Sequence, residues 1–503
     1  MATTTFETSH SGQAFWDGFA RQTIDCQHAI GELIDNALSA PLPNAAGTGA
    51  QPAVIELTLR ELDNGVIRLQ VADAGTGIPW AALTGTPNVF DIGYRPATPG
   101  RMNEHGFGLK NALALLTSGF SRDFKVLSRP TDSGGAIYAV SGPIAAVMQA
   151  QDDCTTNDWE EDLDVLAHVS SGTKVVADIS AQYFKTVYGR AAGFEVLVNR
   201  LAEHLGVMYS VFLEEGNQIW VRYRSAQATN WLKHQLVPVP TPFLSNAQVQ
   251  VTEKTLTFEV DGLEYSAVYR YGLLDKTVKD SESGRPWPYP LRIHFQGSNA
   301  RCGISLIVRG RVLKTGVFRE IWPDKAGDVS FNNFLGELIL DERFRTTNNK
   351  TDLDLHAAVT DRLFDQLRED FQPEKATKRA SEESLRKAII KQLSTVHGLT
   401  GADLPKHKTV WDGSADIDIY YRVGASEHLI ETKVEAGQVA DVYQLLMYWD
   451  GLVDEGKHPT EGVLVAASIP ASVAKAIAHI NDLKDKNGTN YALKTQTIDE
   501  WAE

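Results

Sequence analysis

The segment Ala29–Leu38 places the strongest constraint on how this chain folds. Its apolar residues recur at helical spacing, which predicts a half-buried helix. On a second face, Glu32 and Asn36 lie four residues apart and therefore one helical turn from each other. A carboxylate and a carboxamide placed together in this way can align a water molecule and hold a metal ion. By itself, Glu-x-x-Asp-Asn is equally compatible with an amphipathic surface helix.

A glycine motif follows this helix. Two alternating segments, 54–59 and 66–71, predict paired strands, and the second leads directly into Asp73-x-Gly75-x-Gly77. The aspartate offers a hydrogen-bond acceptor, and the glycines allow the backbone to approach a flat ligand closely. Taken alone, the triplet is also compatible with an ordinary glycine turn.

Two further motifs lie downstream. After a long segment with little regular pattern, Gly106-x-Gly108-Leu109-Lys110 opens a predicted helix. Backbone N–H groups at a helix start, together with a lysine in the first turn, suit the binding of phosphates. Thr173 follows a Ser-Gly pair and begins a predicted strand. Separately, these motifs also fit a flexible hinge and an ordinary strand start.

The order and spacing of the four motifs resemble the GHKL ATPase superfamily, which includes gyrase B, MutL, Hsp-type chaperones, histidine kinases and MORC ATPases. The resemblance covers about residues 15–190. The MORC ATPases are the most similar branch. The segments Gly106–Asn111 and Thr347–Asp352 resemble the phosphate loop and the second-domain lysine loop of that family.

The resemblance implies a role for each motif. Glu32 would be the general base that polarises the attacking water, and Asn36 would hold Mg²⁺ at the phosphates of ATP. Asp73 would accept the adenine amino group, with Thr173 in support. The remaining motif residues would flank the base or bind phosphate oxygens: Gly75, Gly77, Gly106, Gly108, Leu109 and Lys110.

Lys350 would reach from a second domain to the γ-phosphate. This contact would form only when the two domains close, so that ATP would act as a clamp and hydrolysis would release it. Closure in this superfamily usually accompanies dimerisation of the N-terminal domains. We therefore expect a homodimer that forms on ATP binding.

A second group of chemically active residues lies near the C-terminus. Side chains alternate along a strand, so Asp416 and Asp418 are expected on one face of one strand, and Glu431 and Lys433 on one face of the next. Clustered carboxylates suit Mg²⁺, and a lysine beside the metal can orient water for attack on phosphorus. The alternative is that these residues are the solvated faces of edge strands.

With Gln444 and Tyr448 on a following helix, this region resembles the RecB-like branch of the PD-(D/E)xK nuclease superfamily over about residues 380–480. The resemblance implies phosphodiester cleavage that depends on Mg²⁺, with Mn²⁺ as a possible substitute. It also implies an acid on the preceding helix, for which Glu383 or its neighbour Glu382 is the candidate. Which of the two strand aspartates binds metal is left open.

We therefore expect an α/β (α+β) multidomain protein, since 503 residues predict about three domains. The expected parts are a GHKL ATP-binding sandwich of the Bergerat type, an S5-like transducer domain, a linker or exposed helix, and a restriction-endonuclease-like domain. Their expected ranges are 1–190, 191–365, 366–383 and 384–503, respectively.

Composition narrows the class of protein. The formal net charge of −16 argues against a surface that coats polyanions generally, although a local basic groove is still compatible. Three cysteines, odd in number and widely spaced, suit a reducing compartment. No apolar run approaches the roughly 20 residues that span a bilayer, and no signal-peptide pattern opens the chain. The expected location is the cytoplasm, without membrane association.

The leading functional hypothesis is an ATP-hydrolysing clamp that gates a metal-dependent nuclease acting on DNA, as in prokaryotic defence or restriction. One alternative is an ATP-dependent DNA clamp or scaffold whose C-terminal domain does not cleave. Another is a protein-remodelling ATPase that resembles a chaperone.

Overall fold

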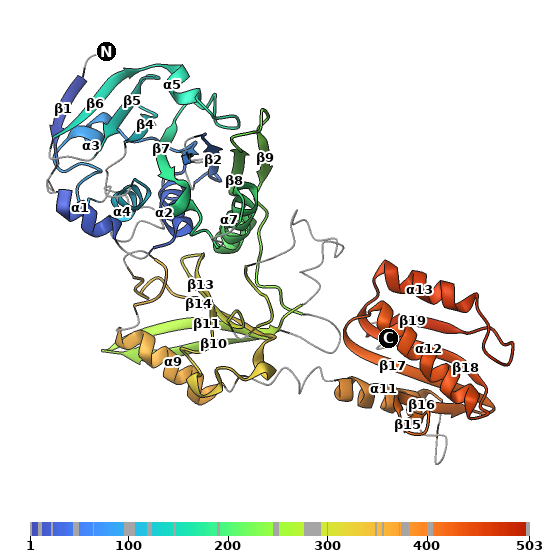
Figure 1. Ribbon diagram of the computed structural model, residues 1–503. Coiled ribbons are helices and arrows are strands. Elements are labelled where there is room, and N and C mark those ends of the chain that lie inside the picture. The colour runs from blue at the N-terminus through green and yellow to red at the C-terminus, as the bar shows by residue number, and fades with distance from the viewer. Residues whose placement is uncertain are drawn as a thin grey trace.

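The computed structural model contains three β-sheets, each with its own helices and hydrophobic core (Figure 1). This confirms the expected mixed α/β multidomain architecture. The structure describes the whole chain apart from residues 1–2, 9–12, 22–23, 44–49, 64, 95–105, 118–122, 144–146, 189–191, 245–250, 276–292, 299, 348–349, 355–356, 372, 374–381, 398, 400–405 and 499–503.

The first unit is built on a nine-stranded sheet in the order β1-β6-β5-β4-β7-β3-β2-β8-β9. Its neighbouring strands run antiparallel, except for the parallel pair β2 and β8. The strands are β1 (Thr3–Glu7), β2 (Val54–Glu61), β3 (Val66–Asp73), β4 (Phe124–Arg129), β5 (Ile137–Gly142), β6 (Val147–Cys154), β7 (Gly172–Ser180), β8 (Gln218–Arg224) and β9 (Leu232–Gln235).

Helices cover one face of this sheet and lie between it and the second unit (Figure 1). They include α1 (Gln13–Ala20), α2 (Cys26–Leu38), α4 (Gly108–Leu116) and α7 (Phe194–Met208). Shorter helices are α3 (Trp80–Thr84), α5 (Thr156–Glu160), α6 (Ala181–Phe184) and α8 (Ser210–Glu214). The described elements α7, α8, β8 and β9 continue this unit beyond residue 190, where the sequence suggested that it ends.

Helix α2 is more deeply buried than its sequence predicts. All of its residues are buried except His28 and Asn36, including the polar side chains of Glu32 and Asp35. An isolated amphipathic helix would expose that polar face. Here the face is covered because the second unit packs against it, as described below.

The second unit contains a five-stranded sheet in the order β10-β11-β14-β12-β13, and α9 packs against β10. Its elements are β10 (Thr252–Val260), β11 (Leu263–Leu273), β12 (Gly303–Val308), β13 (Arg311–Val317), the 3₁₀ turns η2 (Pro323–Lys325) and η3 (Val329–Phe331), β14 (Phe334–Leu340) and α9 (Ala358–Asp370). The helix that the sequence places near Leu353 begins later, because Leu353 instead forms a β-bridge with Thr346.

The third unit has a five-stranded sheet in sequential order, with β15, β16 and β17 antiparallel and β17, β18 and β19 parallel. One core packs α11 on one face, and another packs α12 and α13 on the other. The elements are α11 (Glu382–Val396), β15 (Lys406–Val410), β16 (Ala415–Val423), β17 (Ser426–Ala436), α12 (Val439–Asp454), β18 (Pro459–Ser468), α13 (Ala471–Asn481) and β19 (Leu493–Thr497). None of the described helices is long and apolar enough to span a membrane.

Histidines meet where the first and second units join, beside a cavity of about 480 Å³. The rings of His204 and His294 stack with centroids 5.4 Å apart, and the ring of His28 meets that of His204 edge-on at 5.5 Å. The Tyr188 hydroxyl oxygen and His294 Nε2 each lie 3.2 Å from His204 Nδ1. Burial lowers the pKa of His28 to about 4 and that of His294 to about 3. These rings are therefore neutral at pH 7.

We expect acid to destabilise this interface. In the unfolded chain, histidine titrates near pH 6.5, so between pH 6.5 and about 4 the unfolded state binds more protons than the folded state. The free energy of unfolding should therefore fall as the pH drops through this window. Urea unfolding at pH 7.5, 6 and 5 should show a smaller loss for His28→Leu than for wild type.

The matched control is His479→Leu, because His479 is exposed on α13 and lies outside this interface. This variant should keep the wild-type dependence of unfolding free energy on pH. Equal pH dependence in all three proteins would contradict the assignment to the buried histidines.

Candidate nucleotide and metal sites

The predicted nucleotide residues converge on one cavity of about 400 Å³ in the first unit. It lies between α2, the loop after β3 and the start of α4. The sequence-predicted residues that line it are Asn36, Asp73, Gly77, Gly106, Gly108, Leu109, Lys110 and Thr173. Segments separated by more than 100 residues therefore form a single site.

Asp73 lies in the wall of this cavity and is only 6% exposed. Its Oδ1 accepts hydrogen bonds from the backbone N–H groups of Gly75 at 2.8 Å and Thr173 at 3.2 Å. Burial raises the pKa of Asp73 to about 7, although these two bonds favour the carboxylate. The Gly75 and Thr173 motifs thus orient the acceptor through their backbones.

Gly108 leaves room at the start of α4 for the side-chain ends of Glu32 and Asn36 of α2. A Cβ atom at this position would come within 2.6 Å of Glu32 Oε2 and 3.5 Å of Asn36 Oδ1. Lys110, one turn into α4, donates from Nζ to the carbonyl oxygen of Gly106 at 2.7 Å. Burial lowers the pKa of Lys110 to about 8. The Lys110 side chain thus bonds back to the glycine segment that precedes α4, at the edge of the cavity.

Asn36 suits a magnesium ligand. Its side chain borders the cavity, and its Nδ2 has no hydrogen-bond partner within the described part of the chain. The NH₂ end of the carboxamide is therefore not held by another protein group in that part of the chain. An amide oxygen beside the carboxylate of Glu32 is the type of hard ligand that Mg²⁺ takes in phosphate sites.

Two carboxylates and two cations meet beneath this cavity. Lys350 Nζ lies 3.1 Å from both Glu32 Oε2 and Asp35 Oδ2. Arg311 Nη1 donates to Asp35 Oδ2 and lies 4.0 Å from Glu32 Oε1. The hydroxyl of Tyr209 donates to Asp35 Oδ1 at 2.8 Å. We refer to Glu32, Asp35, Arg311 and Lys350 as the four-charge cluster.

The four-charge cluster is almost completely removed from solvent, since its most exposed residue, Lys350, is 7% exposed. Burial alone would lower the pKa of Lys350, but its ion pairs with Asp35 and Glu32 outweigh that effect and raise it. The pKa of Arg311 is raised for the same reason, mainly by Asp35. Both cations therefore stay charged and neutralise the carboxylates.

The cluster changes the interpretation of Lys350. The sequence predicts a contact with the γ-phosphate, whereas the structure places Nζ on Glu32 and Asp35. Sequence reasoning assigned no role to Asp35, Arg311 or Tyr209. Asp35 could have been found, since it lies three residues after Glu32 on the same helical face. No sequence motif indicated a role for Arg311. Asn348 and Asn349, in the same motif as Lys350, lie outside the described residues.

Comparison with known proteins agrees with this geometry over part of the chain. Residues 22–144 match the family of histidine kinase-, DNA gyrase B- and HSP90-like ATPases. This range contains α2, the Asp73 motif and the start of α4. Residues 22–144 form a GHKL-type ATPase domain. Thr173 and Lys350 lie outside the matched range.

Two other comparisons add little to this assignment. No curated protein matches the chain. A solved structure described as the N-terminal domain of a DNA repair protein covers 71% of this chain and 96% of its own, at 12% identity and a TM-score of 0.39. That similarity is too low to assign a fold or a function.

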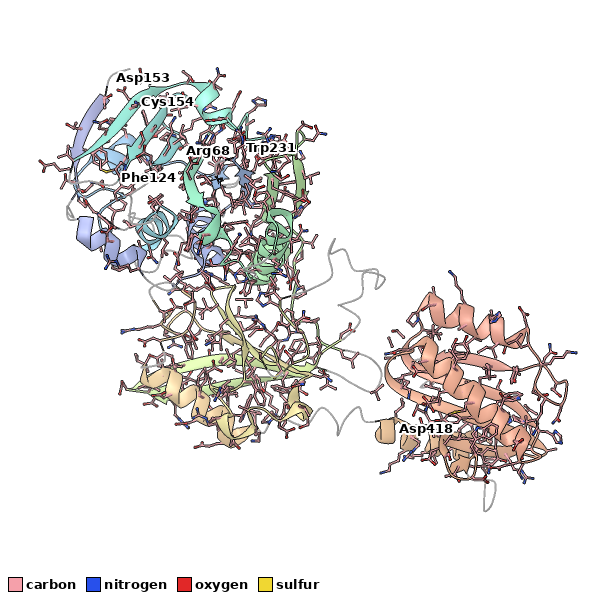
Figure 2. The ribbon with its side chains drawn as sticks, in the orientation of Figure 1. Arg68, Phe124, Asp153, Cys154, Trp231 and Asp418 are labelled. Carbon is pink, nitrogen blue, oxygen red and sulfur yellow. The ribbon has the colours of Figure 1, made fainter. Side chains whose placement is uncertain are left out.

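The third unit brings several of the predicted C-terminal residues together. Lys433 Nζ lies 2.7 Å from Glu431 Oε1 on β17. Asp418 on β16, labelled in Figure 2, accepts hydrogen bonds from the N–H group of Thr432 at 2.9 Å and its hydroxyl at 2.7 Å. A carboxylate on each of two neighbouring strands and one ammonium therefore lie at the same end of the sheet.

Tyr448 and Gln444 project from α12 toward the same point. Gln444 Nε2 donates to the Tyr448 hydroxyl at 2.5 Å. Burial raises the pKa of Tyr448 to about 12, with a further contribution from the charge of Glu431 and a smaller one from Asp418. The tyrosine is thus neutral, and it lies close enough to both carboxylates for their negative charges to raise its pKa.

Asp416 lies apart from Asp418, Glu431 and Lys433. It is exposed at the start of β16, opposite Thr409 of β15. The expected alternation fails because β16 pairs irregularly with β15. Ile417 and Tyr420, three residues apart, therefore pack in the same core against α12. The side chain of Glu383 lies outside the described residues.

Among the described residues, no three His, Cys, Asp or Glu side chains converge closely enough to hold a metal ion by themselves. Asp418 and Glu431 are the predicted carboxylates that lie together, and Asp441 of α12 comes within 4.0 Å of Lys433. Mg²⁺ is commonly held by one or two carboxylates together with water and a substrate phosphate. The donor set therefore fits a metal that is completed by a nucleic-acid phosphate.

Gly108→Ala should impair ATP turnover, because the new methyl group would lie 2.6 Å from Glu32 Oε2 and displace that carboxylate. We expect at least a tenfold loss of turnover, since misplacement of a general base by about 1 Å can cost about 100-fold. The control is Gly18→Ala, since a Cβ at Gly18 meets no atom within 4 Å. Normal turnover in Gly108→Ala would show that this close approach is not needed.

Proposed function

We propose that the protein is an ATP-hydrolysing clamp that gates a metal-dependent nuclease acting on DNA. The observation that carries the proposal is the ion pair between Lys350 of the second unit and Glu32 beside the nucleotide cavity. Through this pair, a cation outside the ATPase domain contacts the group proposed to activate water. The position of the second unit and the chemistry of ATP are thereby linked.

In the proposed reaction, Glu32 takes a proton from a water molecule whose oxygen attacks the γ-phosphorus. The bond from the γ-phosphorus to its bridging oxygen breaks, and ADP leaves with the electron pair. Mg²⁺ held by Asn36 would neutralise charge on the phosphates. The N–H groups at the start of α4 would bind phosphate oxygens, and Asp73 would accept the adenine amino group. Catalysis of this kind relies on positioning and on charge neutralisation.

Lys350 would exchange partners during this cycle. Its Nζ contacts Glu32 and Asp35, so the proposed general base is paired with this ammonium group. The γ-phosphate of ATP competes for the same ammonium group because it is a stronger anion. Transfer of Lys350 to ATP would free Glu32 and tighten the contact between the two units. We propose that this closed state is the one that dimerises.

The third unit would supply the nuclease. Asp418 and Glu431 would hold Mg²⁺ at the scissile phosphate, where the metal neutralises negative charge. Lys433 would orient the attacking water, and Tyr448 would support the site as a neutral hydrogen-bonding group. A nuclease needs only a local cationic groove and a metal, so the acidic net charge does not oppose this. A role in restriction or defence is proposed from the combination of the two activities.

Glu32→Ala should bind ATP but hydrolyse it at least 100-fold more slowly, since a general base contributes about 10²–10⁴-fold. The protein should then accumulate as the ATP-bound dimer, measurable by light scattering after size exclusion. Lys350→Ala should lower turnover while keeping most of the affinity for ADP, because ADP lacks the γ-phosphate. Unchanged turnover in Glu32→Ala would remove its assigned role.

Glu431→Gln and Lys433→Ala should each abolish cleavage of nucleic acid in the presence of Mg²⁺ or Mn²⁺. The assay compares double-stranded DNA, single-stranded DNA and RNA, each without nucleotide, with ATP and with a non-hydrolysable analogue. Lys457→Ala is the matched control, because Glu455 and Lys457 form a second Glu-x-Lys pattern. Lys457 lies outside the proposed site, 4.0 Å from Glu427.

Cleavage that survives in Glu431→Gln and Lys433→Ala would show that the nuclease site is elsewhere. ATPase activity without cleavage of any substrate by the wild type would favour the non-cleaving clamp. ATPase activity that no nucleic acid alters would favour a protein-remodelling role.

A further inference from the structure

Arg311 belongs to the four-charge cluster, but the proposed function above assigns it no role. It comes from β13 of the second unit and is completely buried. Its Nη1 donates to Asp35, which is also held by the hydroxyl of Tyr209. The guanidinium is therefore fixed against α2 by a carboxylate that the nucleotide cavity does not reach.

Arg311 still has unused hydrogen-bonding capacity. Within the described part of the chain, its Nε and Nη2 have no hydrogen-bond acceptor, and Glu32 Oε1 has no donor. Nη1 and Oε1 are 4.0 Å apart. That separation is about 1 Å longer than an ordinary charge-assisted hydrogen bond. A small rotation of the Glu32 side chain would close it.

We propose that Arg311 is a positioning residue for ATP hydrolysis: it takes over the ion pair with Glu32 when Lys350 turns to the nucleotide. The inference rests on the proposed exchange of Lys350. A carboxylate as buried as Glu32 needs a cationic partner. Arg311 can serve, because it stays charged and is anchored independently by Asp35.

Gly31 shows that α2 is adapted to this guanidinium. A glycine inside a helix costs stability relative to alanine. A Cβ at Gly31 would lie 3.3 Å from Arg311 Nη2 and 3.5 Å from the Tyr209 hydroxyl oxygen, which is 2.8 Å from the carbonyl oxygen of Gly31. The missing side chain therefore makes room for Arg311 and Tyr209 against the helix backbone.

The test measures steady-state ATP turnover and, separately, the dissociation constant of ADP. Arg311→Gln should lower the turnover number about tenfold or more, as expected for a misdirected general base, while ADP affinity changes less than about twofold. Arg311→Lys should restore part of the turnover, because a cation returns to the same place. A merely structural role would instead lower both quantities together, with no rescue by lysine.

Arg270→Gln is the matched control. Arg270 lies in the same sheet as Arg311 and pairs with the buried Glu337 at 2.8 Å. This variant loses a partly exposed ion pair away from the nucleotide cavity and should keep wild-type turnover. If Arg311→Gln does not fold, Gly31→Ala displaces the guanidinium without removing it and should give the same separation of turnover from ADP affinity.

The outcomes separate the two proposals. A wild-type protein without ATPase activity overturns both. Suppose that the wild type hydrolyses ATP and Glu32→Ala does not. Normal turnover in Arg311→Gln would then overturn only the role of Arg311. Parallel loss of turnover and ADP affinity in Arg311→Gln, or equal loss in Arg270→Gln, overturns it as well.

Discussion

The ion pairs between α2 and the second unit are the interaction on which the rest of the structure depends. Glu32 and Asp35 are buried only because Lys350 and Arg311 arrive from outside the ATPase domain to neutralise them. Removing one partner of such a buried pair costs about 3–5 kcal/mol, because the remaining charge is left without compensation. The two units are therefore held in register by charges that neither could bury alone.

This arrangement gives one helix two functions. Asn36 faces the nucleotide cavity, while Glu32, one turn earlier, contacts the cations of the second unit. A displacement of α2 would therefore move both sets of contacts together. The C-terminal site differs in this respect, since Asp418, Glu431 and Tyr448 all come from one unit with its own core. Control by ATP would then act on access or on the pairing of two copies, and not on assembly of that site.

Local pattern predicted much of the fold and most of the motif residues that line the cavity of the first unit. Alternation and helical spacing gave α2, β2, β3 and β7 to within a few residues. The glycine motifs indicated which loops approach the ligand. The same rules failed at Asp416, because alternation along β16 is broken by its irregular pairing with β15. A single strand carries no information about the register of its neighbour.

The sequence by itself determined which residues could bind ATP, because each motif specifies its chemistry locally: a carboxylate, a carboxamide, glycines and a lysine at helix and strand ends. The tertiary structure alone decided what neutralises them. Arg311 and Lys350 lie about 280 and 320 residues from α2, and no short pattern marks an arginine as the partner of a distant aspartate. Buried charges choose partners by proximity in space, so that pairing becomes visible only once the two units are packed together.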